Sequence, residues 1–471
     1  MINQRVAQTR RLGSVIGLMI VCACSDHPTG SATAAPTIGK AVVTANEHNV
    51  LSAVASAAVS DADSIAVVFR RADDTMSADT SAAVLVRNGH ADVSMLGLRP
   101  STKYNVRLVA WAGDRSTTGD VIVFSTAALP ADLPSYTAAG TDPSPGFVVF
   151  ASGPYAIAID NSGRIVWYRR FPHTAGLAFV AQANGRYFAR PTSPDPADSE
   201  HWVELNALGE VVRQLPCTGG LVSRPHDLIV QPGGSYWLMC DDVRVVDLSS
   251  QGGQSNAKVT GTAIQHIGAD GRPLFLWSPF DHLDITDLDP SKRAGSTVNW
   301  THGNALDLDS EGNIMISFRN LEEVTRINGT TGAVLSRLGG RKNQFTISGS
   351  TNPPFAQQHS ARLSSANEII LLDNLGNPSE SRAERYTLDW ASMTAKMTGS
   401  FGSSPGVVTA IGGSVQSLPA GRMLVSFGTA GRVEEYDAAG NVVWRIDGNP
   451  GYVFRAQRIN SLYAPGAGTT R

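Results

Sequence analysis

Three histidines stand at corresponding places in three β-hairpin patterns of the chain, and an arginine ends one of these hairpins. The patterns are HDLIVQPGGSYWLMC from His226, HGNALDLDSEGNIMISFRN from His302 and HSARLSSANEIILLDN from His359. Because the first and last residues of an antiparallel hairpin lie at the same end, we expect His302 and Arg319 to be neighbours. If the hairpins are arranged radially, all four side chains converge on one point.

Two kinds of site would use these residue types. Three imidazoles suit a zinc ion, but the guanidinium of Arg319 would repel a divalent cation, so a zinc hydrolase is the weaker alternative and no metal or other cofactor is expected. Arginine presents a planar fork of donors to oxyanions, and histidine can donate, accept or attack near neutral pH. The set therefore predicts transfer of an anionic group such as sulfuryl through a nucleophilic histidine.

The elements that must position these residues form a repeat that starts near residue 146. A turn followed by an apolar strand recurs in DNSGRIVWYRR, NALGEVVRQL, GADGRPLFLWS, NGTTGAVLSRL and DAAGNVVWRI. Units begin near residues 146, 176, 226, 302, 359 and 413, each long enough for about four strands, which predicts a six-bladed β-propeller over 146–471. The first strand of each blade lines the central channel, and the segment from Tyr452 closes the ring.

The region before the repeat predicts a separate small domain, so the chain as a whole is expected to be all-β. Residues 38–128 alternate in strand fashion, and LGLRPSTKYNVRLVAWAG resembles a fibronectin type III sandwich in which Tyr104 packs across the sheets. Residues 129–145 are rich in Pro, Ser, Gly and Thr and are expected to be a linker.

The N-terminus reads as an export signal. Arg5, Arg10 and Arg11 precede a short apolar stretch that ends in VCAC, which predicts a lipoprotein signal over 1–23, a lipid on Cys24 and a tether over 24–37. Plain secretion with cleavage near Ala34 is the alternative. We expect a lipid-anchored protein of the periplasm or cell surface, and Ser25 after the cysteine favours the outer membrane.

Composition limits the remaining possibilities. The 471 residues include 46 Gly and 25 Pro, and the formal net charge of -3 comes without a basic block, which argues against nucleic-acid binding. Beyond the signal and Cys24, two of the four cysteines remain. Cys217 and Cys240 are expected to form a disulfide in an oxidising compartment, with two separate thiols as the alternative.

Three stretches carry a resemblance to a known family. They are NWTHGNALDLDSEGNIMISFRNLEEVTRI, QQHSARLSSANEIILLDN and SRAERYTLD. They resemble the bacterial arylsulfate sulfotransferases, six-bladed propellers with a small N-terminal sandwich, over roughly residues 146–460. The resemblance implies transfer of a sulfuryl group from a phenolic sulfate ester to a phenol, without a nucleotide donor, through a sulfated histidine.

The resemblance also implies a role for each matching residue. QQHSARL gives His359 as the nucleophile, WTHGN gives His302, the following strand end gives Arg319, and the HD pair one blade earlier gives His226. Arg382 in the SR pair and Trp300, which could stack on an aryl group, are expected to bind substrate. The family includes dimers, so a homodimer is a possible state.

A different class of function stays open from the residues themselves. The same channel mouth could belong to a propeller that binds an anionic aromatic or glycan ligand without turnover. A sulfuryl adduct on the protein would distinguish the enzyme from such a binding protein.

Overall fold

The computed structural model describes residues 34–193, 195, 200–377 and 379–466 of the chain. The expected signal sequence and the proposed lipidation site Cys24 lie outside the described residues. Within the described residues, no helix is long and apolar enough to cross a membrane.

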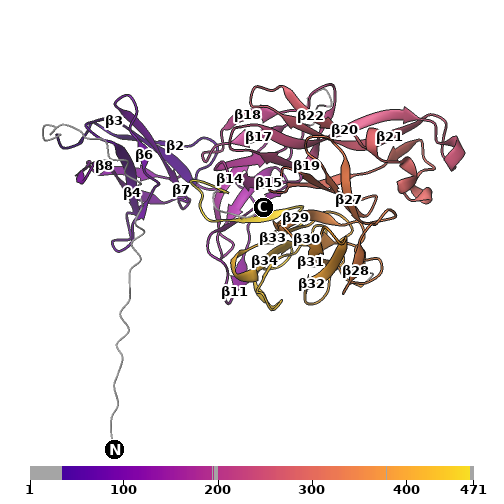
Figure 1. Cartoon of the computed structure of the whole chain (residues 1–471). Coiled ribbons are helices and arrows are strands. Elements are labelled where there is room, and N and C mark those ends of the chain that lie inside the picture. Colours follow the sequence, from indigo (N-terminus) through magenta and orange to yellow (C-terminus); the bar gives the residue numbers. More distant parts are fainter. Residues whose placement is uncertain (1–33, 194, 196–199, 378, 467–471) are drawn as a thin grey trace, which may run out of the picture.

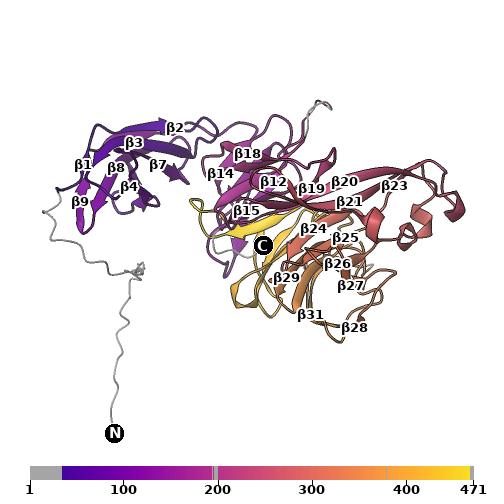
Figure 2. The same ribbon diagram turned by 45° about the horizontal axis from the view of Figure 1, so that its top comes forward.

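Two small sheets form the N-terminal domain, which lies at one side of the molecule in both views (Figures 1 and 2). Their inward residues make one core, whose members come from both sheets. The first sheet comprises β1 (Thr37–Ile38), β3 (Ser52–Ser60), β2 (Val42–Ala45) and β7 (His90–Leu96). The second comprises β10 (Ile122–Ser125), β8 (Lys103–Ala112), β4 (Ser64–Arg71), β5 (Asp79–Thr80), β6 (Val84–Leu85) and β9 (Arg115–Thr118).

Tyr104 holds the position in this domain that the sequence predicts. It is the second residue of β8, it is buried, and its ring meets Phe69 edge-on at 6.2 Å. Its hydroxyl accepts a hydrogen bond from the backbone N–H of Arg99 over 2.7 Å. A tyrosine bonded to the backbone a few residues upstream is the corner motif of β-sandwiches.

A propeller-like ring of six sheets follows, counted over the described residues. Neighbouring strands in each sheet are mostly consecutive in the chain, and they are antiparallel apart from two short edge strands that pair in parallel. The innermost strands are β37 (Ala456–Ile459), β15 (Phe179–Gln182), β19 (Val222–Val230), β24 (Gly303–Leu308), β29 (His359–Ser365) and β33 (Ser414–Ser417). Second in order are β12 (Phe147–Ser152), β16 (Arg186–Ala189), β20 (Tyr236–Val246), β25 (Ile314–Phe318), β30 (Glu368–Asp373) and β34 (Met423–Ser426).

The outer strands complete each sheet. Third are β13 (Tyr155–Ile159), β17 (Trp202–Leu205), β21 (Ala257–Ile267), β26 (Glu323–Ile327), β31 (Arg382–Asp389) and β35 (Val433–Tyr436). Fourth are β14 (Ile165–Arg170), β18 (Val211–Leu215), β22 (Pro273–Trp277), β27 (Val334–Gly339), β32 (Thr394–Gly402) and β36 (Val442–Ile446). Short additions are β11 (Ala138–Gly140), β23 (Thr297–Asn299), β28 (Thr346–Ser348) and the helix α1 (Pro279–His282). The two parallel edge strands are β23, which pairs with β21, and β28, which pairs with β32.

The repeated turns form because an Asp or Asn side chain caps them. The carboxylate Oδ1 of Asp160 accepts from the backbone N–H groups of Ser162 and Arg164, and Gly163 takes a positive φ of 88°. The same pattern recurs at Asn206 and at Asp437. Such side chains bond their own backbone two residues on, and glycine tolerates the left-handed conformation. The turn-and-strand repeat expected from the sequence thus has a local cause.

Two seams close the ring. β37 pairs with β12, so the segment expected from Tyr452 onward does complete the first sheet. β11 adds to the outer edge of the last sheet by pairing with β36. β11 lies inside the stretch 129–145 expected to be a linker, so part of that stretch is bound to the ring instead.

The N-terminal domain contacts the ring through a few specific bonds. The hydroxyl of Tyr168 accepts from the N–H of Val50 over 3.1 Å, and the hydroxyl of Tyr463 accepts from the N–H of Leu96 over 3.2 Å. Leu51 is fully buried and packs with the core of the first and last sheets. The two parts of the chain therefore share a packed interface.

Candidate active site

The structure brings the three predicted histidines together at the centre of the ring. The rings of His226 and His302 meet edge-on with centroids 5.1 Å apart. Phe454 lies between the first and third histidines, with ring centroids 5.5 Å from His226 and 6.0 Å from His359. The three histidines therefore form one cluster, and they come from three successive sheets of the ring.

A break in strand register accompanies each histidine. The pairing of inner and second strands shifts between Ser223 and Leu228 around His226, between Gly303 and Ala305 after His302, and between His359 and Arg362. Bulges of this kind redirect side chains. His302 itself has a positive φ of 48°. His226 lies four residues inside β19 rather than at its start, and the wide break in its strand still directs it to the centre.

Arg319 neighbours His302, as the hairpin geometry predicts. Its backbone N–H donates to the carbonyl of His302 over 3.0 Å. Its guanidinium donates to Oε1 of Gln357, to Oδ1 of Asn320 over 3.1 Å and to the carbonyl of Ala410 over 3.2 Å. Burial lowers the pKa of Arg319, but arginine keeps its charge in proteins. Arg319 thus supplies a fixed positive charge beside the cluster.

The hydrogen bonds of His359 determine which ring nitrogen carries the hydrogen. Its Nδ1 lies 2.8 Å from Oδ1 of Asn374 and 3.1 Å from the carbonyl of Gln357. Asn374 is fully buried, and its Nδ2 donates to the carbonyls of Thr409 and Gly412 over 2.9 Å each, which leaves its oxygen facing the imidazole. Two acceptors at Nδ1 require that Nδ1 carry the hydrogen, so Nε2 holds the lone pair.

The hydrogen bond of His302 selects the other tautomer. Its Nδ1 lies 2.7 Å from Nδ2 of Asn299, an amide donor, so the proton of the neutral ring sits on Nε2. The buried Nδ1 of His226 has no hydrogen-bond partner among the described residues. Buried polar atoms of this kind usually bond a water or a ligand. His359 therefore has its lone pair on Nε2, and His302 has its N–H on Nε2. His226 has a buried Nδ1 without a hydrogen-bond partner among the described residues.

The cluster is electrostatically suited to an anion. Burial lowers the pKa of His359 to about 4, against the opposing effect of its hydrogen bond to Asn374. Burial also lowers the pKa of His302 to about 3, and the charges of Arg224 and Arg319 add to the effect. Burial and then Arg224 hold the pKa of His226 well below its usual range. The site thus contains neutral imidazoles among positively charged arginines.

Two further arginines lie close enough to lower the pKa of the histidines, and no sequence motif marks either of them. Arg224 precedes His226 on β19 and forms an ion pair with Asp241. Arg455 donates to Oδ1 of Asp227 over 2.8 Å and adds to the lowered pKa of His226 and of His359. Phe454 was missed for the same reason as Arg455. Both belong to the C-terminal segment, which reaches the site only through ring closure.

Asp227 forms the floor of the site. It is fully buried and binds Arg362 of β29 together with Arg455. Its Oδ2 also accepts from the backbone N–H of Leu306 in β24 over 2.9 Å. The carboxylate therefore ties three inner sheets and the closing segment beneath the histidines.

Two residues predicted to bind substrate have other partners in the structure. Trp300 is only 1% exposed and packs edge-on against Phe280 at 5.1 Å, so its burial in the core prevents stacking on an aryl group. Arg382 begins β31, two strand spacings or about 10 Å from β29. Its guanidinium pairs with Glu380 and bonds Oγ of Ser400 over 2.5 Å. The expectation that Trp300 stacks on an aryl group is therefore corrected, whereas substrate binding by Arg382 stays a prediction.

The cysteines lie next to the His226 hairpin. Cys217 and Cys240 are joined by a disulfide with their Cα atoms 6.2 Å apart. Cys240 is the residue of β20 that pairs with Ser223, where the strand break of β19 begins. The bridge thus fastens the hairpin that carries Arg224 and His226.

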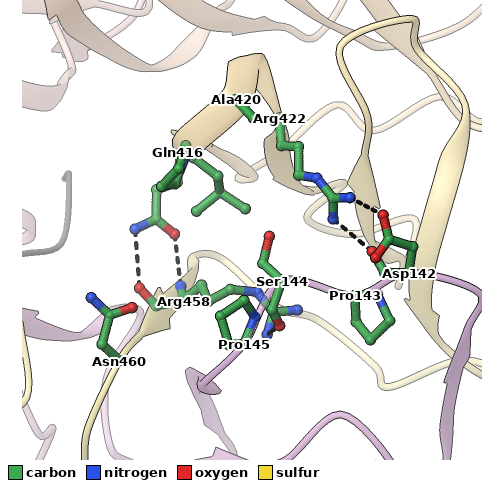
Figure 3. A pocket seen from close by; sticks show the side chains of 11 residues that line it. Asp142, Pro143, Ser144, Pro145, Gln416, Ala420, Arg422, Arg458 and Asn460 are labelled. Carbon is green, nitrogen blue, oxygen red and sulfur yellow. Dashed lines mark hydrogen bonds and ion pairs between the residues drawn. The ribbon is translucent and has the colours of Figure 1, made fainter. Parts of the chain in front are cut away.

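A separate cavity of about 350 Å³ lies at the opposite end of the inner strands (Figure 3). Its lining includes Leu418 after β33 and Arg458 in β37. Its charged groups pair with one another, since Arg422 binds Asp142 and Glu435, and Arg458 also binds Glu435. None of the three histidines lines it. Among the described residues, no group of three or more His, Cys, Asp or Glu side chains has an arrangement that could hold a metal ion.

Comparison with known proteins gives one family match. Residues 222–449 match the family model described as arylsulfotransferase (ASST). No curated protein sequence matches the chain.

Several solved structures are similar in fold. A streptogramin B lyase is 13% identical over 66% of this chain and 84% of its own, with a TM-score of 0.39. The virginiamycin B lyase of Staphylococcus aureus is 10% identical over 65% of this chain and 87% of its own, with a TM-score of 0.36. The dihydro-heme d1 dehydrogenase NirN is 12% identical over 76% of this chain and 74% of its own, with a TM-score of 0.36.

Proposed function

We propose that the protein is an arylsulfate sulfotransferase, and the match of residues 222–449 to the arylsulfotransferase family model supports this proposal. The protein moves a sulfuryl group from a phenolic sulfate ester to a phenolic acceptor. In this proposal residues 146–471 form a six-bladed β-propeller that carries the site, and residues 38–128 form a fibronectin type III-like sandwich. No cofactor is part of the reaction.

The observation that carries the proposal is the state of His359. Its Nδ1 faces two acceptors, Asn374 and the carbonyl of Gln357, so its Nε2 is an unprotonated nucleophile. The lowered pKa of about 4 keeps this nitrogen unprotonated at neutral pH without any proton transfer. A nucleophile of this kind splits one difficult transfer into two easier ones.

In the first half-reaction, the lone pair on Nε2 of His359 attacks sulfur. An N–S bond forms, the S–O bond to the aryl group breaks, and the phenolate oxygen leaves with the electron pair. The imidazole becomes a sulfohistidine whose Nδ1 proton stays bonded to Asn374. This hydrogen bond stabilises the charge that the ring gains.

The other members of the cluster hold the sulfuryl oxygens. The Nε2–H of His302 is a donor, and His226 has an unpartnered nitrogen. Three donor contacts of Arg319 are already made within the protein, and its guanidinium has five N–H groups, so donors remain for an oxyanion. A bound negative charge raises the pKa of nearby histidines. His226 or His302 then takes up a proton from solvent as the donor binds and passes it to the leaving oxygen.

The second half-reaction reverses the chemistry. The acceptor phenol gives its proton to the histidine that protonated the leaving group, or leaves it with solvent, and its oxygen attacks sulfur. The N–S bond breaks, the electron pair returns to Nε2, and the new aryl sulfate departs. The enzyme is then back in its starting state.

Replacement of His359 tests the proposal. We expect His359→Ala to abolish transfer from 4-nitrophenyl sulfate to phenol, while His90→Ala, an exposed histidine of the N-terminal domain, keeps wild-type activity. Intact-protein mass spectrometry after brief exposure to donor without acceptor should show one added sulfuryl group on the wild type and none on His359→Ala. Tight donor binding with no adduct and no released phenol would instead identify a binding protein.

We also propose a location outside the cytoplasm, with a lipid anchor on Cys24. Support comes from the basic and apolar N-terminal pattern ending in VCAC. The disulfide between Cys217 and Cys240 adds support, because such bonds persist in oxidising compartments.

A further inference from the structure

An exposed isoleucine lies beside the proposed nucleophile. Ile411 directly precedes Gly412, whose backbone N–H donates to Nε2 of His359 over 3.3 Å. Two bonds of about 1.3 and 1.5 Å separate the backbone nitrogen of Gly412 from the Cα of Ile411. This Cα therefore lies within about 6 Å of Nε2 of His359. The residue is nevertheless 54% exposed. An apolar side chain this close to a reactive nitrogen and still open to solvent has no packing role that accounts for it.

The position of Ile411 is fixed by the site itself. It belongs to the segment 403–413 between β32 and β33, whose carbonyls at Thr409 and Gly412 accept from Asn374. The carbonyl of Ala410 accepts from Arg319 over 3.2 Å. The carbonyl of Ile411 accepts from the N–H of Thr429 over 3.2 Å. Hydrogen bonds therefore fix the backbone on both sides of Ile411, and its exposed side chain is the part of the residue that a ligand can contact.

An aromatic residue lies on the other side of Gly412. A Cβ added to Gly412 would come 2.6 Å from the hydroxyl oxygen of Tyr452, so Tyr452 lies directly against this backbone. Tyr452 is 40% exposed. Burial of its hydroxyl raises the pKa of Tyr452 to about 12, so it stays protonated at neutral pH and does not serve as a base. The exposed part of the Tyr452 side chain can therefore contact a ligand.

We infer that the side chains of Ile411 and Tyr452 bind the aromatic ring of the sulfate donor and, after it leaves, that of the phenolic acceptor. This inference rests on the proposed function. In a displacement with attacking and leaving atoms in line, the aryl oxygen lies on the far side of sulfur from Nε2. The ring then projects outward past Gly412, toward the two exposed apolar surfaces. Trp300, buried in the core, does not provide this contact.

Kinetics with alanine variants test the inference. For 4-nitrophenyl sulfate, we expect Ile411→Ala and Tyr452→Ala each to lower kcat/KM about fivefold to tenfold, mainly through KM, because each removes apolar contact with the ring. Leu276→Ala is the matched control, since Leu276 is 57% exposed on the outermost strand β22. It should change kcat/KM less than twofold.

A second donor separates ring contact from general damage to the site. The ratio of kcat/KM for 2-naphthyl sulfate to that for 4-nitrophenyl sulfate should fall in Ile411→Ala, because the larger ring loses more contact. A general loss of structure would lower both values and leave the ratio unchanged. Ile411→Gln, which keeps the length of an exposed side chain and removes its apolar character, should lower the ratio in the same direction.

The outcomes distinguish this inference from the function on which it rests. Active wild type, together with Ile411 and Tyr452 variants that match Leu276→Ala in both ratio and kcat/KM, would overturn the inference and leave the sulfotransferase proposal intact. Absence of any transfer by the wild type would overturn both. A selective loss for aromatic donors supports ring binding at Ile411 and Tyr452.

Discussion

At the scale of single residues, hydrogen bonds give chemically equivalent histidines different states. Asn374 and the carbonyl of Gln357 fix the proton of His359 on Nδ1, whereas Asn299 directs the proton of His302 to Nε2. The orientation of Asn374 is itself fixed by two carbonyls that accept from its Nδ2. A buried amide that is bonded at every position thus selects the nitrogen that reacts.

Replacing Asn374 should therefore impair chemistry more than binding. In Asn374→Ala, His359 keeps only one weaker acceptor at Nδ1, so the reactive tautomer and ring position are less well held. We expect kcat for sulfohistidine formation to fall about 10- to 100-fold with a smaller change in KM. Stopped-flow release of 4-nitrophenol measures this step. A variant with unchanged kcat would show that Asn374 does not orient the nucleophile.

The lowered histidine pKa values predict how stability depends on pH. The pKa of His359 is about 4 when folded, against about 6.5 when unfolded. Between these values the unfolded chain binds more protons, so this histidine's contribution to stability is present above pH 6.5 and is lost as the pH falls toward 4. The loss is about 3 kcal/mol in the free energy of unfolding.

Other groups also titrate in this range, so the comparison needs a variant. Urea unfolding of the wild type and of His359→Gln, each at pH 4.5 and pH 8, isolates the contribution of His359. The variant should lose less stability on acidification than the wild type. Equal losses would contradict the depressed pKa.

At the scale of elements, the inner strands carry the site and an ion-pair group beneath it joins them. Asp227 of β19 binds Arg362 of β29 and Arg455 of the closing segment, and accepts from Leu306 of β24. Ion pairs removed from water add little net stability, but breaking one leaves an uncompensated charge. The group therefore matters chiefly for holding the strands in one arrangement.

Replacing Asp227 with its neutral isostere should be costly. Asp227→Asn leaves the buried guanidinium groups of Arg362 and Arg455 without this carboxylate, and we expect the free energy of unfolding to fall by about 3–5 kcal/mol. Chemical denaturation measures the change. The exposed pair of Arg170 and Asp132 provides a control, and Asp132→Asn should cost less than about 1 kcal/mol. Similar losses in both variants would contradict a structural role for Asp227.

The sequence was informative where structure is local and less so where it is not. The turn repeats and the hairpin histidines were predictable, because Asp or Asn caps, glycines and alternation act within about ten residues. The adjacency of His302 and Arg319 follows from one hairpin. Phe454 and Arg455 could not be assigned, since their places depend on ring closure. Asn374 ends the His359 hairpin as Arg319 ends its own, but its role could not be assigned because its orientation depends on the carbonyls of Thr409 and Gly412. Trp300 was assigned to the substrate although it is buried in the core, because position near a motif does not tell which way a side chain points.

At the scale of the whole molecule, a small sandwich and a ring share one interface, and the proposed lipid anchor precedes the sandwich. We expect Cys24→Ser to move the protein from the membrane fraction to the soluble fraction without loss of sulfotransferase activity, because the site lies wholly in the ring. Fractionation with immunodetection measures the change. Unchanged membrane association would contradict anchoring at Cys24. A homodimer remains a prediction for sedimentation measurements.

The pairing of β37 with β12 has a consequence for when the protein can act. The first sheet waits for a strand made about 300 residues later, and the same late segment delivers Phe454 and Arg455 to the histidines. During synthesis, a partly made chain thus contains His226, His302 and His359 without Phe454 and Arg455 beside them. Under the proposed function, we expect such an incomplete chain to be inactive until its last strand has paired with β12.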